Sequence, residues 1–201
     1  MQLEIARLVG GVGRSDPIPT SGPFHLLGMA LTFRDSETTH WLGEVVVQSR
    51  ENMCFGRKWA SDRRDPFRCY ICELYCRNAG KSGFPDNFGQ YGNVFEAWQQ
   101  PAELADAIHL ICDRHVEQIN MGDPDEIGEF ENNPYDIFPS EILALYRVRE
   151  KLGLATPSVK HPLLDTPFVN VPKDITCEPE PLVVQAMDFV TKLLPEAVAK
   201  R

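Results

Sequence analysis

From residue 66 onward, apolar side chains recur with the three-to-four-residue spacing of α-helices, and this periodicity most constrains how the chain can fold. Gly80 follows the first of these periodic stretches and Gly153 follows the third, where a glycine commonly ends a helix. Proline is a favourable residue in the first helical turn. Four helices are therefore expected, at about Pro66–Asn78, from Pro101, at about Ser140–Leu152 and at about Pro181–Leu194.

The first fifty residues instead carry the signals of β-strands. Two apolar runs, FHLLGMALTF and HWLGEVVVQS, flank the polar stretch RDSETT, as in a hairpin with a polar loop. The β-branched residues Val45, Val46 and Val47 favour a pleated setting. Strands followed by helices predict an α+β fold, with an N-terminal antiparallel hairpin or small sheet (1–50) packed against about four C-terminal helices (66–201). The 201 residues fit a single domain.

Three connecting segments complete this predicted architecture. Residues 79–99 hold four glycines and a proline and are expected to form a loop, and residues 122–136 are expected to form an acidic loop. Within residues 156–174, prolines recur every five residues, which indicates either an extended ribbon over the domain or a loop with accidental spacing. The prolines are Pro157, Pro162, Pro167 and Pro172, and the expected apolar anchors are Leu163, Leu164, Phe168 and Val171.

The net charge of −9 is distributed unevenly along the chain. Residues 1–100 hold 11 basic and 11 acidic side chains, whereas residues 101–201 hold 9 basic and 18 acidic ones. This excess disfavours DNA and anionic membranes as partners and favours a basic protein. The first residues lack the features of a secretory signal, and the longest uncharged apolar stretch, of ten residues, is too short to span a bilayer. We therefore expect a soluble, cytoplasmic protein with no membrane partner.

Three cysteines lie close together at Cys69, Cys72 and Cys76. Their i, i+3 and i+7 spacing places them on one face of a helix, where free cysteine is commonly buried, so a structural role is predicted. The alternative is a metal- or thiol-dependent site in which Cys54 supplies the fourth sulfur. The second C-x-x-C of a zinc site is missing, so no metal and no cofactor is predicted.

The acidic stretch GDPDEIGEFENNPYD is the most unusual in composition, because it contains six carboxylates and no basic residue. It fails the calcium-loop pattern, since Ile127 and Pro134 occupy two ligand positions. One interpretation is a solvated loop, and the other is a docking surface with two aromatic anchors. The candidate partner-binding residues are Asp123, Asp125, Glu126, Glu129, Phe130, Glu131, Tyr135 and Asp136.

A basic cluster with interleaved aromatic residues lies in GRKWASDRRDPFR, residues 56–68. Such a composition can bind a phosphate backbone and stack bases. Asp62 and Asp65 interrupt the cluster, and the chain as a whole is acidic. A solvated loop, or an internal partner for the acidic half, is therefore preferred to a nucleic-acid site. The basic residues are Arg57, Lys58, Arg63, Arg64 and Arg68.

The stretch EILALYRVREKLGLATPSVKHPLLDTPF, about residues 142–168, resembles immunity proteins of bacterial polymorphic-toxin and type VI secretion systems. The resemblance implies a cytoplasmic inhibitor that binds one cognate toxin and masks its active site, with no catalytic residue of its own. Many such toxins are nucleases with basic substrate clefts, which an acidic loop would complement.

Two other classes of function stay open at the level of sequence. One is an enzyme that depends on a metal or a thiol through Cys54, Cys69, Cys72 and Cys76. The other is a structural or regulatory interaction domain, including a nucleic-acid module that uses residues 57–68. Metal content would identify the first class, and salt-dependent DNA binding would identify the nucleic-acid module.

Overall fold

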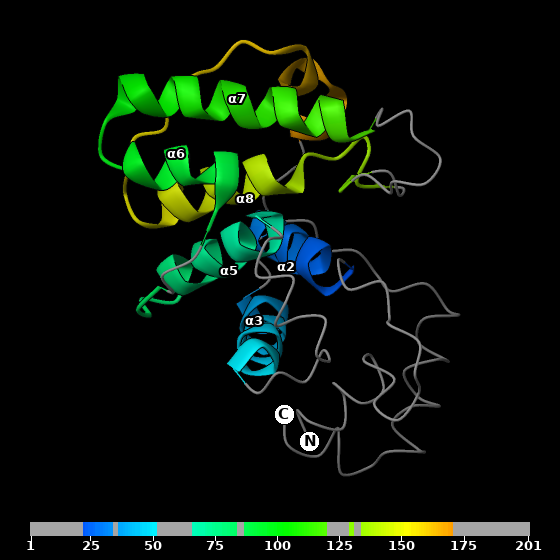
Figure 1. Cartoon of the computed structure of the whole chain (residues 1–201), viewed down its shortest axis with the longest axis vertical. Coiled ribbons are helices and arrows are strands. Elements are labelled where there is room, and N and C mark those ends of the chain that lie inside the picture. Colours follow the sequence, from blue (N-terminus) through cyan, green and yellow to red (C-terminus); the bar gives the residue numbers. More distant parts are fainter. Residues whose placement is uncertain are drawn as a thin grey trace.

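A computed structural model describes residues 22–33, 36–51, 66–83, 87–119, 129–130 and 134–170, and these residues form helices and connecting turns without any strand (Figure 1). The α-helices are α2 (Gly22–Phe33), α3 (Ser36–Glu51), α5 (Pro66–Asn78), α6 (Gly92–Glu96), α7 (Pro101–Ile119) and α8 (Ser140–Lys151). Short 3-10 helices occur at η1 (Gly89–Tyr91), η2 (Pro162–Asp165) and η3 (Pro167–Asn170).

The predicted α+β fold is wrong, because the two N-terminal apolar runs form the helices α2 and α3 and not a hairpin. In the first run, Phe24, Leu27 and Leu31 stand at i, i+3 and i+7, so a helix places all three on one buried face. In the second run, Leu42 and Val46 are buried four residues apart. Tertiary burial of these faces outweighs the weak preference of the valines for strands.

The three helices predicted between residues 66 and 152 are confirmed. α5 has the predicted bounds, α7 begins at Pro101, and α8 ends at Lys151, one residue before the predicted end. Gly80 and Gly153 have φ values of 66° and 70°, a left-handed conformation that glycine adopts without strain and that ends a helix. Residues 79–99, expected to be a loop, contain η1 and α6, and the helix expected at 181–194 lies outside the described residues.

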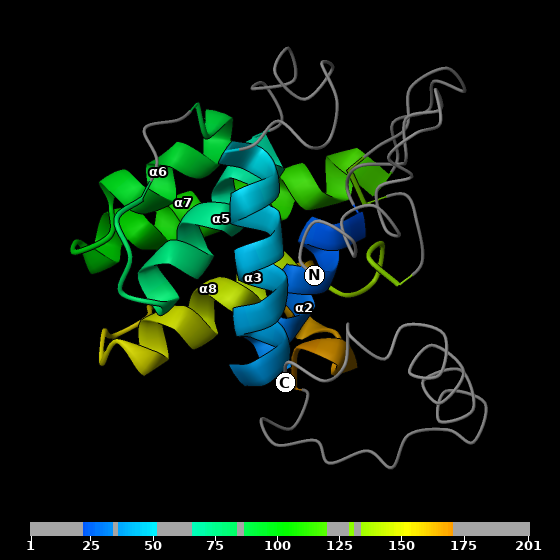
Figure 2. The ribbon, with the colours of Figure 1, turned by 90° about the horizontal axis from the view of Figure 1, so that it is seen from below.

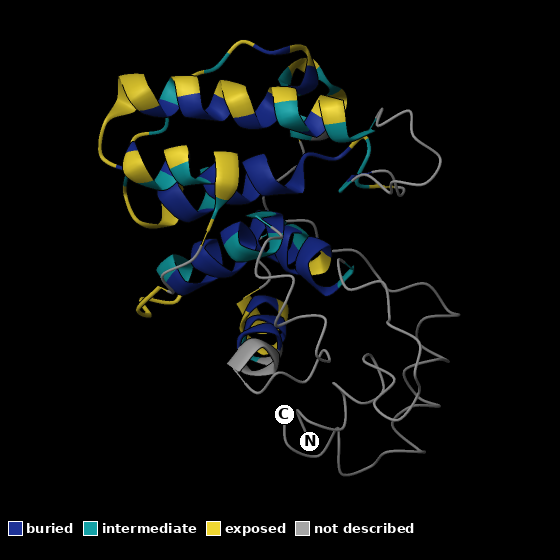
Figure 3. Cartoon of the chain, viewed as in Figure 1, coloured by how far each residue is buried: buried dark blue, intermediate teal, exposed yellow. Residues whose placement is uncertain are grey.

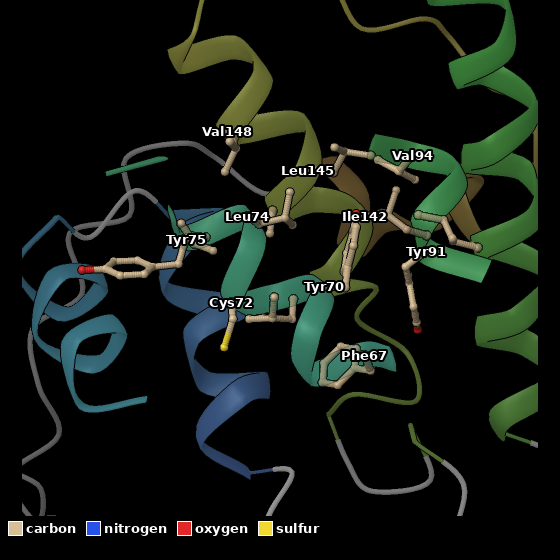
Figure 4. Close-up of a cluster of buried hydrophobic side chains, with 14 of the residues drawn as sticks. Phe67, Tyr70, Cys72, Leu74, Tyr75, Tyr91, Val94, Ile142, Leu145 and Val148 are labelled. Carbon is tan, nitrogen blue, oxygen red and sulfur yellow. The ribbon is translucent and has the colours of Figure 1, made fainter. Parts of the chain in front are cut away.

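One hydrophobic core joins the described helices, with α5 at its centre (Figure 4). Residues 70–76 of α5 are all buried, because α2, α3, α8 and η1 all pack against this helix. Tyr70 and Leu74 of α5 lie beside Val94 of α6 and Ile142 of α8. After a rotation of 90°, α3 is seen to lie across α5 and beside α2 (Figure 2).

α7 covers this core with one face and leaves the opposite face exposed (Figure 3). Leu104, Ile108, Ile111 and His115 recur every three or four residues and are all fully buried. Nearly half of the helix surface therefore faces solvent in the described structure. None of the described helices combines the length with the apolar character that crossing a membrane requires.

The proline-rich segment begins as chain without regular structure at residues 154–161 and then forms two 3-10 turns. Each turn begins at a proline, Pro162 in η2 and Pro167 in η3, so the five-residue spacing sets the start of both turns. The ring of His161 caps η2, because its Nδ1 accepts a hydrogen bond from the backbone N–H of Leu163 at 3.2 Å. Leu163 is buried and Leu164 packs on the core, so these two anchors are confirmed. The side chain of Phe168, together with Val171 and Pro172, lies outside the described residues.

Candidate functional site

The first candidate site is a pair of buried histidines that contact, from two helices, the segment formed by the described residues 129–130 and 134–136. His25 lies in α2 and is 2% exposed, and His115 lies in α7 and is fully buried. Histidine is seldom fully buried without a hydrogen-bonded or charged partner. The surroundings of these two rings therefore decide which protonation state each one adopts.

His115 is held between a carboxylate and a backbone carbonyl. Its Nδ1 lies 2.8 Å from Oε1 of Glu141, and its Nε2 lies 3.4 Å from the backbone oxygen of Asp136. Both neighbours accept hydrogen bonds, so a ring with a proton on each nitrogen satisfies both contacts. Burial by itself lowers the pKa of His115, but the charge and hydrogen bond of Glu141 outweigh burial and raise the pKa above its ordinary value. When His115 is protonated, it forms a buried ion pair with Glu141.

His25 has the opposite environment. Its ring stacks on Tyr135 with centroids 4.1 Å apart and lies 4.4 Å from the ring of Phe67. Its Nδ1 is buried and has no hydrogen-bond partner among the described residues. Burial lowers the pKa of His25 to about 4, although the charge of Glu141 opposes this shift. The two pKa values are therefore shifted in opposite directions, so there is a range of pH in which His25 is neutral and His115 is protonated.

A second polar contact fixes the start of the same segment. Arg114 of α7 forms an ion pair with Glu129, and the hydroxyl of Tyr91 donates to Oε2 of Glu129 at 3.1 Å. The backbone N–H of Glu129 donates to the side chain of Gln118 at 3.2 Å. Phe130 then inserts between the histidines, stacked on His115 at 4.2 Å and edge-on to His25 at 5.6 Å.

A histidine paired with a carboxylate is also the arrangement of many general bases. In such a base the second ring nitrogen faces the substrate. Here Nε2 of His115 faces the carbonyl of Asp136, and both His115 and Glu141 are fully buried. In the described structure no substrate can reach this nitrogen, so the pair acts in the packing of the segment.

The predicted docking run is thus engaged internally where the structure describes it. Phe130 is 1% exposed, Tyr135 is half-buried against His25, and Glu129 is paired with Arg114. Phe130 is therefore not available as an anchor for a partner in this structure. Asp136 is half-buried and its carbonyl faces His115. Asp123, Asp125, Glu126 and Glu131 lie outside the described residues.

The predicted helical placement of the cysteine cluster is confirmed, because Cys69, Cys72 and Cys76 all lie in α5. Cys72 and Cys76 are each 1% exposed, and neither forms a disulfide. Burial raises the pKa of Cys112, in α7, to about 12, which keeps this thiol from acting as a nucleophile. Within the described part of the chain, no group of three or more His, Cys, Asp and Glu side chains is placed to hold a metal, and Cys54 lies outside that part.

The basic cluster is described only at its end. Phe67 is buried in the core, and the guanidinium of Arg68 lies 5.7 Å from the ring centroid of Phe24. Both residues therefore take part in internal packing. The remaining basic residues, Arg57, Lys58, Arg63 and Arg64, lie outside the described residues.

The second candidate site is the exposed side of α7, which sequence analysis did not single out. Four exposed carboxylates lie within an arc of about 80° if each residue turns by about 100°. Leu110 and Val116 lie on the same exposed side and are 45% and 41% exposed. The only arginine of α7, Arg114, is turned toward Glu129. We call this surface the acidic face of α7; its carboxylates are Glu103, Asp106, Asp113 and Glu117.

The middle of the acidic face contacts the proline-rich segment. Oδ1 of Asp113 lies 3.1 Å from Nε2 of His161, and Oδ2 lies 4.0 Å from Nε2 of His109. Because Nδ1 of His161 accepts from Leu163, its Nε2 carries the proton and donates to Asp113. No lysine or arginine among the described residues forms an ion pair with any of the four carboxylates.

No known protein family, curated protein or solved structure matches the chain. The resemblance of residues 142–168 to immunity proteins therefore stays an expectation from the sequence. In the described residues, the fold and the two sites define a helical protein with a closed histidine cluster inside and an acidic helix face outside.

Proposed function

We propose that this protein is an inhibitor that binds a basic protein partner through the acidic face of α7. The observation that carries the proposal is the row of four exposed carboxylates, which no lysine or arginine of the described residues neutralises. The partner that we propose is a cognate toxin with a basic active-site cleft, as the resemblance to immunity proteins implies.

The dimensions of the acidic face suit a cleft. Glu103 and Glu117 are fourteen positions apart, so the row is about 21 Å long at about 1.5 Å per residue. A charged row of this length steers a partner of opposite charge and raises the association rate. A helix face is also a common recognition element, because it presents a rigid set of side chains to a groove.

The exposed apolar residues of this face would slow dissociation of a complex, which charge alone does not do. Interfaces gain most of their lifetime from a few buried apolar or aromatic anchors, while the surrounding charges select the partner. Leu110 lies within the row of carboxylates, and Val116 lies about 60° around the helix from the edge of the row, on the same exposed side. We propose these two as anchors in place of Phe130, which is part of the core.

The acidic run that follows α7 in sequence extends the same proposal. Asp123, Asp125 and Glu126 come within seven residues of the end of α7 at Ile119. Their charge would add to that of the helix face in a bound complex. The proposal does not depend on their placement, since the four carboxylates of α7 are sufficient to test it.

The test is co-expression with the candidate toxin, meaning the product of a neighbouring gene, followed by binding kinetics at two salt concentrations. The variant Asp106→Lys with Glu117→Lys should slow association about tenfold or more and weaken its salt dependence. The matched control, Glu37→Lys with Glu96→Lys, makes the same change in charge at exposed positions of α3 and α6.

The control pair should leave protection of cells and association unchanged. Leu110→Ala with Val116→Ala should mainly speed dissociation, by about tenfold if the anchors contribute about 1.4 kcal/mol. Equal behaviour of the two lysine pairs would mean that only net charge matters and would remove α7 as the interface. Lack of binding to any basic partner would overturn the proposed function.

A further inference from the structure

The segment formed by residues 129–130 and 134–136 is attached to the helical core through the two buried histidines, and Glu129 is held in addition by Arg114, Tyr91 and Gln118. We infer that His25 and His115 form a pH-sensitive latch, which holds this segment closed near neutral pH and releases it on acidification and on alkalinisation. The latch itself does not rest on the proposed function. A role of the latch in partner binding would rest on that function.

His25 contacts the segment at both of its ends. It meets the edge of Phe130 at 5.6 Å and stacks on Tyr135 at 4.1 Å. The ring is also packed on the core side, 4.4 Å from Phe67 of α5. One imidazole thus joins α2 and α5 to residues five positions apart in the segment.

His115 contacts the same segment through Phe130 and Asp136. Its ring stacks on Phe130 at 4.2 Å, and its Nε2 lies 3.4 Å from the carbonyl oxygen of Asp136. On the core side its Nδ1 is held by Glu141 of α8 at 2.8 Å. The contact with Asp136 is a hydrogen bond only while Nε2 carries a proton.

Charged groups face both histidines from the neighbouring helices. His25 is influenced by Glu141 of α8, by Arg68 of α5 and by His115 of α7. His115 is influenced mainly by Glu141, and also by Asp136 of the segment. Glu141 thus interacts with both rings, and its Oε2 has no hydrogen-bond partner among the described residues.

Acid opens the latch through His25. A proton on buried Nδ1 would have no acceptor in the described structure and would lie near the positive charges of Arg68 and His115. The closed state therefore resists protonation, with a pKa of about 4 for His25, whereas an exposed ring has the ordinary value of 6.5. Since the open state binds the proton first, lowering the pH from about 6.5 toward 4 favours opening.

Alkali opens the latch through His115. Its pKa is raised in the closed state, so the closed state binds this proton more tightly than an open state does. Its contribution to closure is therefore complete below pH 6.5 and is lost as the pH rises through the raised value. The two effects have opposite signs, so closure should be strongest near pH 6.5, where neither histidine opposes it.

Release of the segment would expose Phe130 and Tyr135. These two aromatic side chains are flanked in sequence by Glu129, Glu131 and Asp136. An open segment would thus present the combination of aromatic anchors and carboxylates that suits a basic partner. If the proposed function holds, opening adds a second contact surface to the acidic face of α7.

The test is hydrogen–deuterium exchange of the intact protein from pH 4.5 to 9, corrected for the intrinsic rate at each pH. Backbone amides of residues 129, 130 and 135–138 should be most protected near pH 6.5. At pH 4.5 they should open more readily than at pH 6.5: the two pKa values of His25, 6.5 and about 4, correspond to about 40-fold, and the opposite effect of His115 lowers this factor. Amides of α8 serve as the internal reference for global unfolding.

Two variants separate the two histidines. We call the loss of protection below the optimum pH the acid arm and the loss above it the alkaline arm. His25→Phe keeps an aromatic ring that cannot titrate and should abolish the acid arm. Glu141→Gln removes a charge that raises the pKa of both histidines, so it should weaken the alkaline arm and move it to lower pH while it strengthens the acid arm. His109→Gln is the control, because His109 is an exposed histidine on the opposite side of α7, and it should leave both arms unchanged.

Two results would overturn the latch. The first is an acid arm of unchanged size in His25→Phe. If this variant does not fold, His25→Gln is read in the same way. The second concerns the wild type alone: if residues 129, 130 and 135–138 lose protection only together with α8 at every pH, the segment does not open separately and there is no latch.

Discussion

Arg149 is the largest fully buried side chain of the described structure, and its charge is balanced by carbonyl groups. Its guanidinium donates to the backbone oxygens of Trp98, at 2.6 Å, and of Ala155, at 2.5 Å. It also lies 5.0 Å from the ring centroid of Trp98, and burial lowers its pKa. No carboxylate of the described residues forms an ion pair with it. One side chain of α8 thereby holds both the turn before α7 and the start of the proline-rich segment.

We therefore expect Arg149→Met to lower the free energy of unfolding by about 3 kcal/mol. Methionine fills much of the volume but leaves the buried carbonyl of Trp98 and the partly buried carbonyl of Ala155 without their donor, and a buried group without a partner costs about 1–3 kcal/mol. Lys151→Met is the matched control, since its amino group donates to the Asn78 carbonyl at an exposed site and its loss should cost less than about 1 kcal/mol. Urea denaturation measures the free energy of unfolding of both variants. Equal losses in the two variants would mean that water donates to the two carbonyls in place of the Arg149 guanidinium.

At the scale of single elements, a glycine decides how closely α3 approaches α5. A Cβ at Gly43 would lie 2.2 Å from a ring atom of Tyr75. The ring of Tyr75 cannot move easily, because it is 1% exposed and its hydroxyl donates to Glu44 at 2.5 Å. The close contact of the two helices therefore requires a residue without a side chain at position 43.

Gly43→Ala should destabilise the protein by about 1–3 kcal/mol, although alanine is the better helix former by about 1 kcal/mol. The same replacement at Gly92 is the control, because a Cβ there meets only Phe88 at an ordinary 3.7 Å. Gly92→Ala should be neutral or slightly stabilising. In thermal unfolding, Gly43→Ala should lower the melting temperature, and Gly92→Ala should leave it unchanged or raise it slightly. A stabilised Gly43→Ala protein would contradict the observed packing of α3.

Sequence periodicity predicted the helices that have one buried and one exposed face. It failed for helices in which apolar residues surround most of the axis. α7 alternates buried and exposed residues at the helical period, so its start and its buried residues were predictable. In α2, Pro23 to His25 are all buried together with Leu27, Gly28, Ala30 and Leu31, so apolar residues surround most of the helix. A short apolar run of that kind is also typical of a strand, and periodicity alone cannot separate the two.

The two candidate sites also differ in whether sequence periodicity could have revealed them. The acidic face of α7 follows from the helical period and could have been found by placing Glu103, Asp106, Asp113 and Glu117 on a wheel. The histidine cluster could not, because His25 and His115 are ninety positions apart and meet only through the tertiary packing of α2, α7 and α8. The acidic composition of 122–136 likewise gave no sign that Phe130 would be part of the core.

For the whole molecule, the buried cysteines report how the described helices unfold. Cys72 and Cys76 of α5 and Cys112 of α7 are at most 1% exposed, so a thiol reagent should reach them only after the core opens. Their labelling rates, measured by mass spectrometry of the peptides, should be equal to one another. Arg149→Met should raise all three by about 100-fold for a loss of about 3 kcal/mol. Faster labelling of α5 alone would mean that the core opens in parts.

The pairing of α2 with α8 also has a consequence for the order in which the nascent chain can fold. α2 packs mainly on α8, and Thr32 donates a hydrogen bond to the carbonyl of Ser140, 108 residues later. At about 5–20 residues per second, a ribosome needs about 5–20 s to synthesise that interval. Through this time the apolar face of α2 has been made but its main partner has not. Slowing or speeding translation between α2 and α8 should therefore change the yield of folded protein more than the same change made after α8.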